Sequence, residues 1–588
     1  MAVPTNVAET DSAAHALRVK YLFAIDGIWR REILSGIALL FIFLAVSLPR
    51  LKGPIDLRWD ASTYYLLGTA LAEGKGYRLL NEPSEIKAVQ YPPLLPALIA
   101  MQQRLMKTTD YFKVGCRLRI IYFGLSGVYL AAVYILARQL LAPAQAFLVS
   151  AVTALSFNSF VYPSETLYAD LPFALVSIAF ILCQRKNDRP FFAVAQAFLG
   201  AAAYLLRTAG IVLLAAWIGE SLVRRRWNQA AIRAGIAALP VLAWQSYVLQ
   251  VTRSDEYHRP AYSYQRAPYY YSNVTYRENS SLIDPFRPEL GQSKPGDLVA
   301  RAVRNAVAIP KGLGEAAWFS MPLVRYPLSK MNHKLPIRLS PRAQQILLYV
   351  FGASLVFVGM LGIIGAVIIA RGRDWFLSLY FALTIAIVVL TPWQSQFWRY
   401  LAPIAPITLI FVTVALAAIS CWLNRTRSGQ PKAAILLPVA VLCMMLLLQS
   451  IIAMPFLRNL LPVSYYNASG NERVLQLLTY EPHWHALDRA FEWIRQNAPP
   501  DAIMATTVPQ LGYLRSGHKA VLPPLNSDPA EASHLLNEVP VSLLVLDTLR
   551  RPPISDRYAA PIVAHRPEDW QLAYTAPDGG AKIYRRVR

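Results

Sequence analysis

A series of apolar runs constrains the fold of this chain more than any other feature. The runs span about 33–49, 118–138, 144–161, 169–184, 190–206, 208–223, 232–251, 345–370, 375–391, 400–423 and 433–456. Each approaches the length that an α-helix needs to cross about 30 Å of hydrocarbon. Only 16% of the residues are charged, against about a quarter in soluble domains. The sequence therefore predicts an α-helical polytopic membrane protein with about eleven transmembrane helices.

Basic residues in the short connections between these runs predict which side faces the cytoplasm. The connections that carry them contain Arg30-Arg31, Arg185-Lys186 with Arg189, Arg224-Arg225-Arg226, Arg371 with Arg373, and Arg425 with Arg427. Because Lys and Arg concentrate in cytoplasmic loops, these connections are expected to be cytoplasmic. Segment 190–223 is then interpreted as a hairpin of two helices, since a single helix would place the later basic connections outside.

The net charge of +23 does not point to nucleic acid, because no basic tract is framed by exposed aromatic residues. The predicted topology instead divides the chain into three parts. Residues 1–32 form a cytoplasmic leader, and residues 33–456 form the transmembrane domain with outer loops at 50–117 and 252–344. Residues 457–588 form a C-terminal domain on the outer side of the membrane.

The C-terminal domain has a different residue pattern from the rest of the chain. An amphipathic helix is expected in HWHALDRAFEWIRQN and another helix near 529–538. Strands are expected in DAIMATTV, KAVLPP, VSLLVLD, QLAYTA and AKIYRRV. This order predicts a small α/β domain with a core of its own.

The first outer loop is predicted to form two amphipathic helices, at 61–72 and 93–106, which lie along the membrane interface with their apolar faces in lipid. Asp60 immediately precedes the first of them. An aspartate in this place is commonly a helix cap, and this alternative stays open at the level of the single residue.

Further ionisable residues gather at the same predicted membrane depth. They are Lys87 in the first outer loop, Glu165 and Asp170 near the next outer turn, Arg207 at the hairpin, and Arg399 before a late apolar run. Ionisable groups at membrane depth are costly and commonly functional. The alternative is that they are snorkelling side chains and charge pairs that trim helix ends.

The second outer loop carries the tyrosine-rich stretch YHRPAYSYQRAPYYYSNVTY. Aromatic rings flanked by hydrogen-bond donors suit the faces of sugars and also suit anchoring at a membrane interface. Tyr269 and Tyr270 are therefore candidates for sugar contact, with interfacial anchoring as the equal alternative.

Several short motifs occur together in one order. An Asp follows the first run, Pro92-Pro93-Leu94 opens the second amphipathic helix, an acid lies in the next outer loop, and Arg-Tyr-Leu-x-Pro begins at Arg399. In this the chain resembles the GT-C glycosyltransferases, and in particular the bacterial branch that includes the aminoarabinose lipid A transferase and its protein mannosyltransferase-like relatives. The resemblance covers about 30–456.

The resemblance implies a GT-C fold and a place in the bacterial inner (plasma) membrane. It also implies a polyprenyl-phosphate sugar donor and transfer with inversion, on the periplasmic face, to a lipid or glycan hydroxyl. Asp60 would be the first-loop acid that takes the proton of the acceptor hydroxyl or orients it. Glu165 would be the second-loop acid, with Asp170 as its rival. Since Ala61 follows Asp60 in place of a second acid, a protein acceptor is disfavoured.

The phosphate contact departs from the family pattern. Tyr91 stands where the family often has a lysine that contacts the lipid phosphate, which leaves Lys87 or Arg399 for that contact. The predicted substrate-binding residues are Lys87, Tyr91, Arg207, Tyr269, Tyr270, Arg399 and Tyr400. Whether a divalent metal joins Asp60 and Glu165 stays open, because two carboxylates are too few to define a metal site.

Elementary chemistry is consistent with these assignments. Attack of a hydroxyl on an anomeric carbon needs a base near the nucleophile, and fixed cations stabilise the charge that develops on a leaving phosphate. Two other functions stay open. A transporter or flippase of lipid-linked glycans would carry polar groups at mid-membrane and internal repeats, and a non-catalytic membrane scaffold would tolerate Asp60→Asn.

Overall fold

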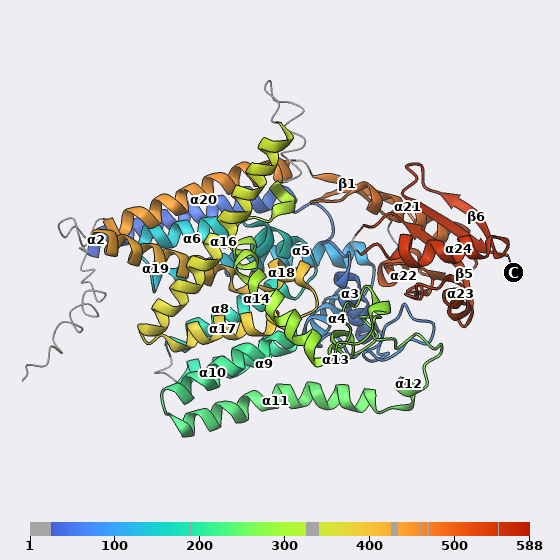
Figure 1. Cartoon of the computed structure of the whole chain (residues 1–588), viewed down its shortest axis with the longest axis horizontal. Helices are drawn as coiled ribbons and strands as arrows, with labels where there is room; N and C mark the ends of the chain where they lie inside the picture. The colour runs from blue at the N-terminus through green and yellow to red at the C-terminus, as the bar shows by residue number, and fades with distance from the viewer. Residues whose placement is uncertain are drawn as a thin grey trace, which may run out of the picture.

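The computed structural model describes residues 25–186, 190–324, 340–424, 433–458, 460–466, 470–550 and 552–587. Most of the predicted leader, part of the second outer loop, and Arg189, Arg425 and Arg427 of the basic connections lie outside these ranges. The described chain forms a bundle of long helices with a smaller mixed domain at one end (Figure 1).

Every predicted apolar run forms a helix. The helices are α2 (Ile25–Ser47), α5 (Tyr111–Arg138), α6 (Pro143–Leu155), α8 (Asp170–Gln184), α9 (Pro190–Leu206), α10 (Ile211–Val223), α11 (Trp227–Thr252), α16 (Pro341–Arg371), α17 (Trp375–Val389), α19 (Ala405–Asn424) and α20 (Ala433–Arg458). Among the described helices, six are long and apolar enough to cross a membrane, or up to seven if the pair 143–155 and 157–165, bent by 70°, counts as one. The protein is therefore a multi-pass membrane protein, whereas the count of about eleven spans remains a prediction.

The predicted hairpin at 190–223 is confirmed. Helices α9 and α10 are separate, joined by a short turn around η3 (Thr208–Gly210). The turn is tight, because a Cβ at Gly210 would lie 2.5 Å from the carbonyl carbon of Ala203. Farther from the turn, a Cβ at Gly200 would lie 2.8 Å from a methyl carbon of Leu214. Glycine at both positions lets the two helices fold back on each other.

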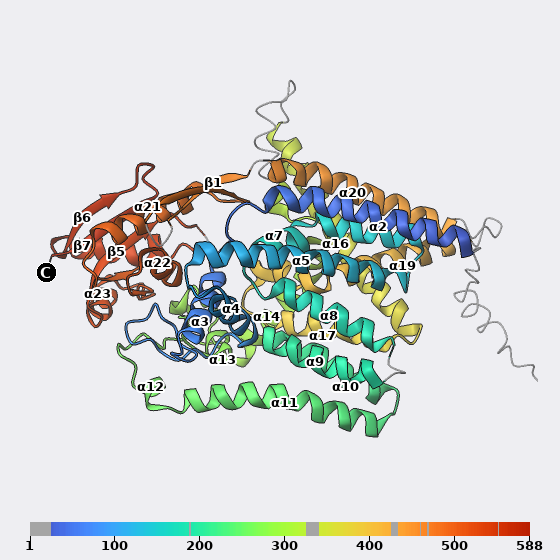
Figure 2. The same ribbon diagram turned by 180° about the vertical axis from the view of Figure 1, so that it is seen from behind.

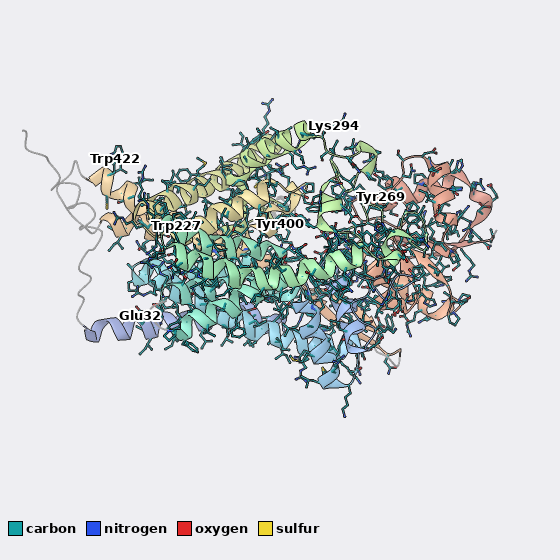
Figure 3. The ribbon with its side chains drawn as sticks, turned by 90° about the horizontal axis from the view of Figure 1, so that it is seen from below. Glu32, Trp227, Tyr269, Lys294, Tyr400 and Trp422 are labelled. Atoms are coloured by element: carbon teal, nitrogen blue, oxygen red, sulfur yellow. The ribbon has the colours of Figure 1, made fainter. Side chains whose placement is uncertain are left out.

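The two ends of the bundle differ in what they carry. Arg185 at the end of α8 forms an ion pair with Asp374, which precedes α17. Figure 3 shows Glu32, Trp227 and Trp422 at this end and Tyr269 toward the other. The basic connections that the structure describes thus lie away from the C-terminal domain, although the side that faces the cytoplasm remains a prediction.

Six shorter helices and the longer α14 are found among the described residues besides the helices of the apolar runs and of the C-terminal domain. They are α3 (Asp60–Ala72), α4 (Leu94–Met106), α7 (Tyr162–Glu165), α12 (Asp255–His258), α13 (Tyr276–Ser280), α14 (Pro295–Ala317) and α18 (Phe397–Tyr400). Helices α3 and α4 confirm the two helices predicted in the first outer loop. In both Figure 1 and Figure 2 they lie where the bundle meets the C-terminal domain.

The expected lipid contact of α3 is wrong. Residues 61–70 are buried inside the protein, because α4 packs on one side of the helix and α22 of the C-terminal domain on another. Helix α4 does present an apolar face, with Leu98, Met101 and Leu105 exposed. Of the two helices of the first outer loop, α4 therefore has the surface of an interfacial helix and α3 does not.

The C-terminal domain is a small α/β unit. Its elements are β1 (Leu461–Tyr466), β2 (Glu472–Leu477), α21 (Pro482–Asn497), β3 (Ile503–Ala505), α22 (Pro509–Ser516), β4 (Ala520–Val521), α23 (Pro529–Asn537), β5 (Val541–Asp547), α24 (Ala560–His565), β6 (Trp570–Thr575) and β7 (Ala581–Arg586). The five-stranded sheet has the order β4-β3-β5-β7-β6, with β3 parallel to β4 and β5, and β7 antiparallel to β5 and β6. The predicted helices and strands are confirmed; the β1-β2 hairpin, α22 and α24 were not expected.

Candidate active site

A large cavity lies where the bundle, the outer loops and the C-terminal domain meet. Its volume is about 910 Å³, near the upper end of the usual range for ligand sites. Seven of the predicted site residues line it: Asp60, Tyr91, Arg207, Tyr269, Tyr270, Arg399 and Tyr400. In Figure 3, Tyr400 lies among the helices and Tyr269 lies closer to the C-terminal domain. The cavity thus joins residues from five separate parts of the sequence.

A network of two acids and two arginines lies at one side of this cavity: Asp60, Arg207 and Arg399 line it, and Asp170 lies outside the lining. Arg399 donates through Nη2 to Oδ2 of Asp60 at 2.8 Å and through Nε to Oδ2 of Asp170 at 3.2 Å. Arg207 donates to Oδ1 of Asp170. The Asp170 side chain is only 3% exposed, whereas that of Asp60 is 24% exposed. Asp170 therefore holds both arginines from behind, and Asp60 keeps a face toward the cavity.

Tyr91 is the second partner of Asp60. Its hydroxyl donates to Oδ1 of Asp60 at 3.1 Å. Burial, together with the negative charge of Asp60, raises the pKa of Tyr91 well above its ordinary value, so Tyr91 remains a hydrogen-bond donor at physiological pH. The tyrosine that replaces the family's usual lysine thus contacts the acid.

Aromatic rings extend from Tyr91 along the cavity. The Tyr91 ring packs edge-on against Tyr64 at 4.8 Å and Tyr271 at 5.8 Å, measured between ring centroids. Tyr271 and Tyr276 then pack against Trp393 at 5.6 Å and 5.5 Å. Such a row offers apolar faces with polar edges, the surface that sugar rings contact in proteins.

A different wall of the cavity is apolar. It is lined by Ile211, Val212, Val241, Val248, Ile387 and Val388 from α10, α11 and α17. These helices belong to the apolar bundle, so the wall leads from the charged network into the membrane domain. The cavity can therefore hold a ligand with a charged head and an apolar tail.

Glu165 and Lys87 lie outside the lining of this cavity. The Glu165 carboxylate pairs with Arg50 at 3.2 Å, and its side chain is 8% exposed. The Lys87 ammonium lies 3.9 Å from a carboxylate oxygen of Glu256 and is 40% exposed. Asp170, the rival of Glu165, is the acid that joins the network of Asp60. The roles of all these residues remain predictions.

Part of the tyrosine-rich stretch makes contacts within the protein itself. The Tyr270 hydroxyl donates to the buried carboxylate of Glu82 at 2.6 Å and accepts from the backbone N–H of Leu522. Tyr269 packs at the edge of the cluster that contains Leu525. The hydroxyl of Tyr270 is thus occupied within the protein, and both rings close the cavity toward the C-terminal domain.

Several lining residues were not predicted. Tyr168 lies under the Arg399 guanidinium at 4.1 Å from the ring centroid, and its place two residues before Asp170 was the available signal. Thr507 and Gln510 line the cavity from the C-terminal domain. No local pattern in the sequence points to these two, because they reach the site only through the way the domain packs.

The described side chains do not by themselves form a metal site. Within the described residues, no group of three or more His, Cys, Asp or Glu side chains is placed to hold a metal ion. Asp60 and Asp170 are joined through the guanidinium of Arg399, a cation that neutralises both.

Comparison with known proteins supports the fold. No family model matches the chain, and no curated protein matches it by sequence. The archaeal oligosaccharyltransferase AglB from Archaeoglobus fulgidus, in complex with an inhibitory peptide and a dolichol-phosphate, aligns with a TM-score of 0.52 and 13% identity over 96% of this chain and 75% of its own. The chain has a GT-C fold.

Two further solved structures are similar to this one. The apo form of the A. fulgidus oligosaccharyltransferase has a TM-score of 0.51 and 13% identity, over 95% of this chain and 74% of its own. ArnT from Cupriavidus metallidurans bound to undecaprenyl phosphate has a TM-score of 0.42 and 11% identity, over 94% and 98%. The two oligosaccharyltransferase alignments, over 96% and 95% of this chain, confirm the GT-C fold predicted from the motifs.

Proposed function

We propose that this chain is a membrane glycosyltransferase that moves a sugar from a polyprenyl-phosphate donor to a hydroxyl of a lipid or glycan. The reaction would take place on the periplasmic face of a bacterial inner membrane. One observation carries the proposal: an acid with a free face, two arginines and an apolar wall meet in a single cavity. The dolichol-phosphate held by the similar AglB structure supports a donor of this class.

The donor phosphate binds at Arg399 and Arg207. Both guanidinium groups line the cavity and are held by Asp170. Arginine pairs with phosphate through two parallel hydrogen bonds, which fixes the orientation of the phosphate as well as its position. The polyprenyl tail then follows the apolar wall formed by α10, α11 and α17.

Asp60 acts as the base. When phosphate engages Arg399, the hydrogen bond between Arg399 and Asp60 weakens, and Oδ2 of Asp60 becomes free to accept a proton from the acceptor hydroxyl. The hydroxyl oxygen bonds to the anomeric carbon while the bond from that carbon to the phosphate oxygen breaks. The electron pair leaves with polyprenyl phosphate, and attack from the opposite side inverts the anomeric carbon.

The arginines also stabilise the leaving group. Negative charge develops on the phosphate as the bond to the sugar breaks, and fixed cations in a site with little water stabilise that charge most strongly. Asp170 lies behind them and keeps their geometry, so no reorganisation is needed during the reaction. The aromatic row beside Tyr91 supplies contact for sugar rings.

A transfer assay tests the proposal. The purified protein in lipid would be incubated with a panel of radiolabelled polyprenyl-phosphate sugars and a membrane-lipid acceptor extract. We expect release of free polyprenyl phosphate from one donor class, and loss of that release in Asp60→Asn. Asp255→Asn is the matched control, since Asp255 is also an aspartate in the first turn of a helix but is exposed and outside the cavity.

The outcomes separate the alternatives. Movement of the intact lipid-linked sugar across the bilayer without release would indicate a flippase and contradict the proposal. Equal release by the parent and by Asp60→Asn would remove Asp60 from the mechanism.

A further inference from the structure

We propose that the C-terminal domain positions the acid Asp60 in the active site. Trp484 and its neighbours hold the loop before Asp60 in a conformation that directs the Asp60 side chain into the cavity. Trp484 is a positioning residue: it acts through Trp59 and Arg58. The inference rests on the proposed function only where it concerns turnover, since the positioning itself is a property of the backbone.

The backbone at Trp59 is strained. Trp59 has φ 55° and ψ −131° and is the residue immediately before α3. A positive φ combined with this ψ belongs to a region that glycine occupies freely and that side chains with a Cβ avoid. Such conformations persist only where the surrounding structure imposes them, and they cluster at functional sites. Here the next residue is Asp60.

Contacts with the C-terminal domain impose this conformation. The Trp59 ring meets the Trp484 ring of α21 edge-to-face, with the centroids 5.1 Å apart. The Arg58 guanidinium lies 4.8 Å from the Tyr480 ring centroid and 5.4 Å from that of Trp484. Trp484 is 4% exposed, so these contacts are shielded from water.

Hydrogen bonds fasten the same loop. Arg58 donates to the carbonyl oxygens of Thr479 at 3.1 Å and Leu478 at 3.4 Å. Asp56 accepts from Nε of Arg58 at 2.9 Å and neutralises its charge. The segment 56–59 thus contacts 478–484 through the rings of Trp59, Tyr480 and Trp484, the Arg58 guanidinium and two carbonyl groups.

The strain has a direct consequence for Asp60. Helix α3 is buried and cannot shift as a whole, so relaxation at Trp59 would change the first turn of the helix. Asp60 is the first residue of that turn. Loss of the Trp484 contact is therefore expected to turn Asp60 away from Arg399 and Tyr91 and leave the lipid-binding wall intact.

The first test deletes the Trp484 ring. We expect Trp484→Ala to lower kcat roughly 10- to 100-fold, as misplacement of a reacting group does, with the donor KM unchanged within about a factor of two because the donor wall is untouched. Trp484→Phe should keep most of the kcat. Trp493→Ala is the matched control, because Trp493 lies on the same helix but stacks on Tyr574 at 5.6 Å, outside the cavity lining.

The second test uses glycine at position 59. Trp59→Ala and Trp59→Gly both remove the ring, but only glycine adopts the observed φ without strain. We expect Trp59→Gly to have a kcat at least about fivefold above that of Trp59→Ala, and to restore part of the kcat when combined with Trp484→Ala. Equal kcat for the glycine and alanine variants would overturn the proposal, as would parental kcat in Trp484→Ala.

Hydrogen exchange measures the positioning without any turnover. Peptides covering 56–66 should exchange faster in Trp484→Ala than in the parent and in Trp493→Ala. Unchanged exchange in this segment would overturn the positioning role. A parent protein that releases no polyprenyl phosphate from any donor would instead contradict the proposed function and leave the exchange result to decide the inference.

Discussion

Two acid–arginine sets can be compared in this protein, and they differ in burial and in what they face. In the first, Arg399 links Asp60 with Asp170 beside a cavity. In the second, Arg50 pairs with Glu165, and both side chains are under 10% exposed. Both sets contain ion-paired acids, but only the first has an acid and an arginine that are partly exposed and line the cavity.

The second set joins elements of the fold. Arg50 also donates to the carbonyl oxygens of Val46 and Val161, and the backbone N–H of Asp56 donates to the carbonyl oxygen of Glu165. These bonds tie the end of the first helix and the first outer loop to α7. A buried pair of this kind is expensive to break, so its main effect is expected on stability.

The largest expected effect is the loss of kcat in Asp60→Asn, because Asp60 is the acid of the first set that faces the cavity. Asp60→Asn should lower kcat by about 10²- to 10⁴-fold, the usual contribution of a general base. Stability should change little, because the side chain is partly exposed and the single carbonyl oxygen of asparagine can still accept one of the two hydrogen bonds. The release assay and a thermal unfolding curve measure the two quantities. A kcat within a factor of about three of the parent would contradict the assignment.

The next effect concerns the cation of the first set. Arg399→Ala removes the group that faces the phosphate and should lower kcat by about 10²- to 10³-fold. It also leaves Asp170 with Arg207 as its remaining cation, so the thermal midpoint should fall. Arg259→Ala is the control, since Arg259 is exposed and outside the cavity lining. Retained turnover in Arg399→Ala would place the phosphate elsewhere.

Glu165→Gln should give the reverse pattern. Removing one charge of a buried pair costs about 3–5 kcal/mol, so the midpoint of thermal unfolding should drop by several degrees while kcat falls less than about fivefold. Turnover normalised to folded protein separates the two effects. A loss of kcat as large as that of Asp60→Asn would make Glu165 a catalytic acid and remove the contrast between the two sets.

Tyr91→Phe should have the smallest effect. It removes one of the two hydrogen bonds to Asp60 and leaves that from Arg399. We expect kcat to fall by roughly two- to tenfold, since a typical hydrogen bond makes a net contribution of about 0.5–1.5 kcal/mol. Because burial and the charge of Asp60 raise the pKa of Tyr91, the parent should show no loss of activity from its ionisation up to about pH 10. An alkaline limb below pH 10 that disappears in Tyr91→Phe would contradict this.

Much of the fold follows from the sequence because it depends on local patterns. Apolar runs of sufficient length form helices whatever their neighbours are, and the strands of the C-terminal domain follow alternation and β-branched residues. The face that a helix presents is a different matter. Helix α3 was predicted to lie at the membrane interface, yet α22 and α4 bury it. Its apolar residues are spread around the helix and are not gathered on one face, which is typical of a buried helix.

The site was predictable in part for the same reason. Asp60, Asp170, Arg207 and Arg399 share one depth because the ends of neighbouring helices meet there, and a topology is enough to bring them together. The choice between Glu165 and Asp170 depends on side-chain direction, which the sequence leaves open. Lys87 is close to Asp60 in the chain but pairs with Glu256, a partner about 170 residues away.

A structure with polyprenyl phosphate bound is the most direct test of the proposal that the donor phosphate binds at Arg399 and Arg207. Cryo-electron microscopy of the protein in lipid nanodiscs with saturating polyprenyl phosphate would locate the phosphate and the first isoprene units. We expect the phosphate oxygens to lie within hydrogen-bond distance of the guanidinium groups of Arg399 and Arg207, and the polyprenyl tail to lie along α10, α11 and α17. A phosphate bound at Arg50, or on the far end of the bundle, would contradict it.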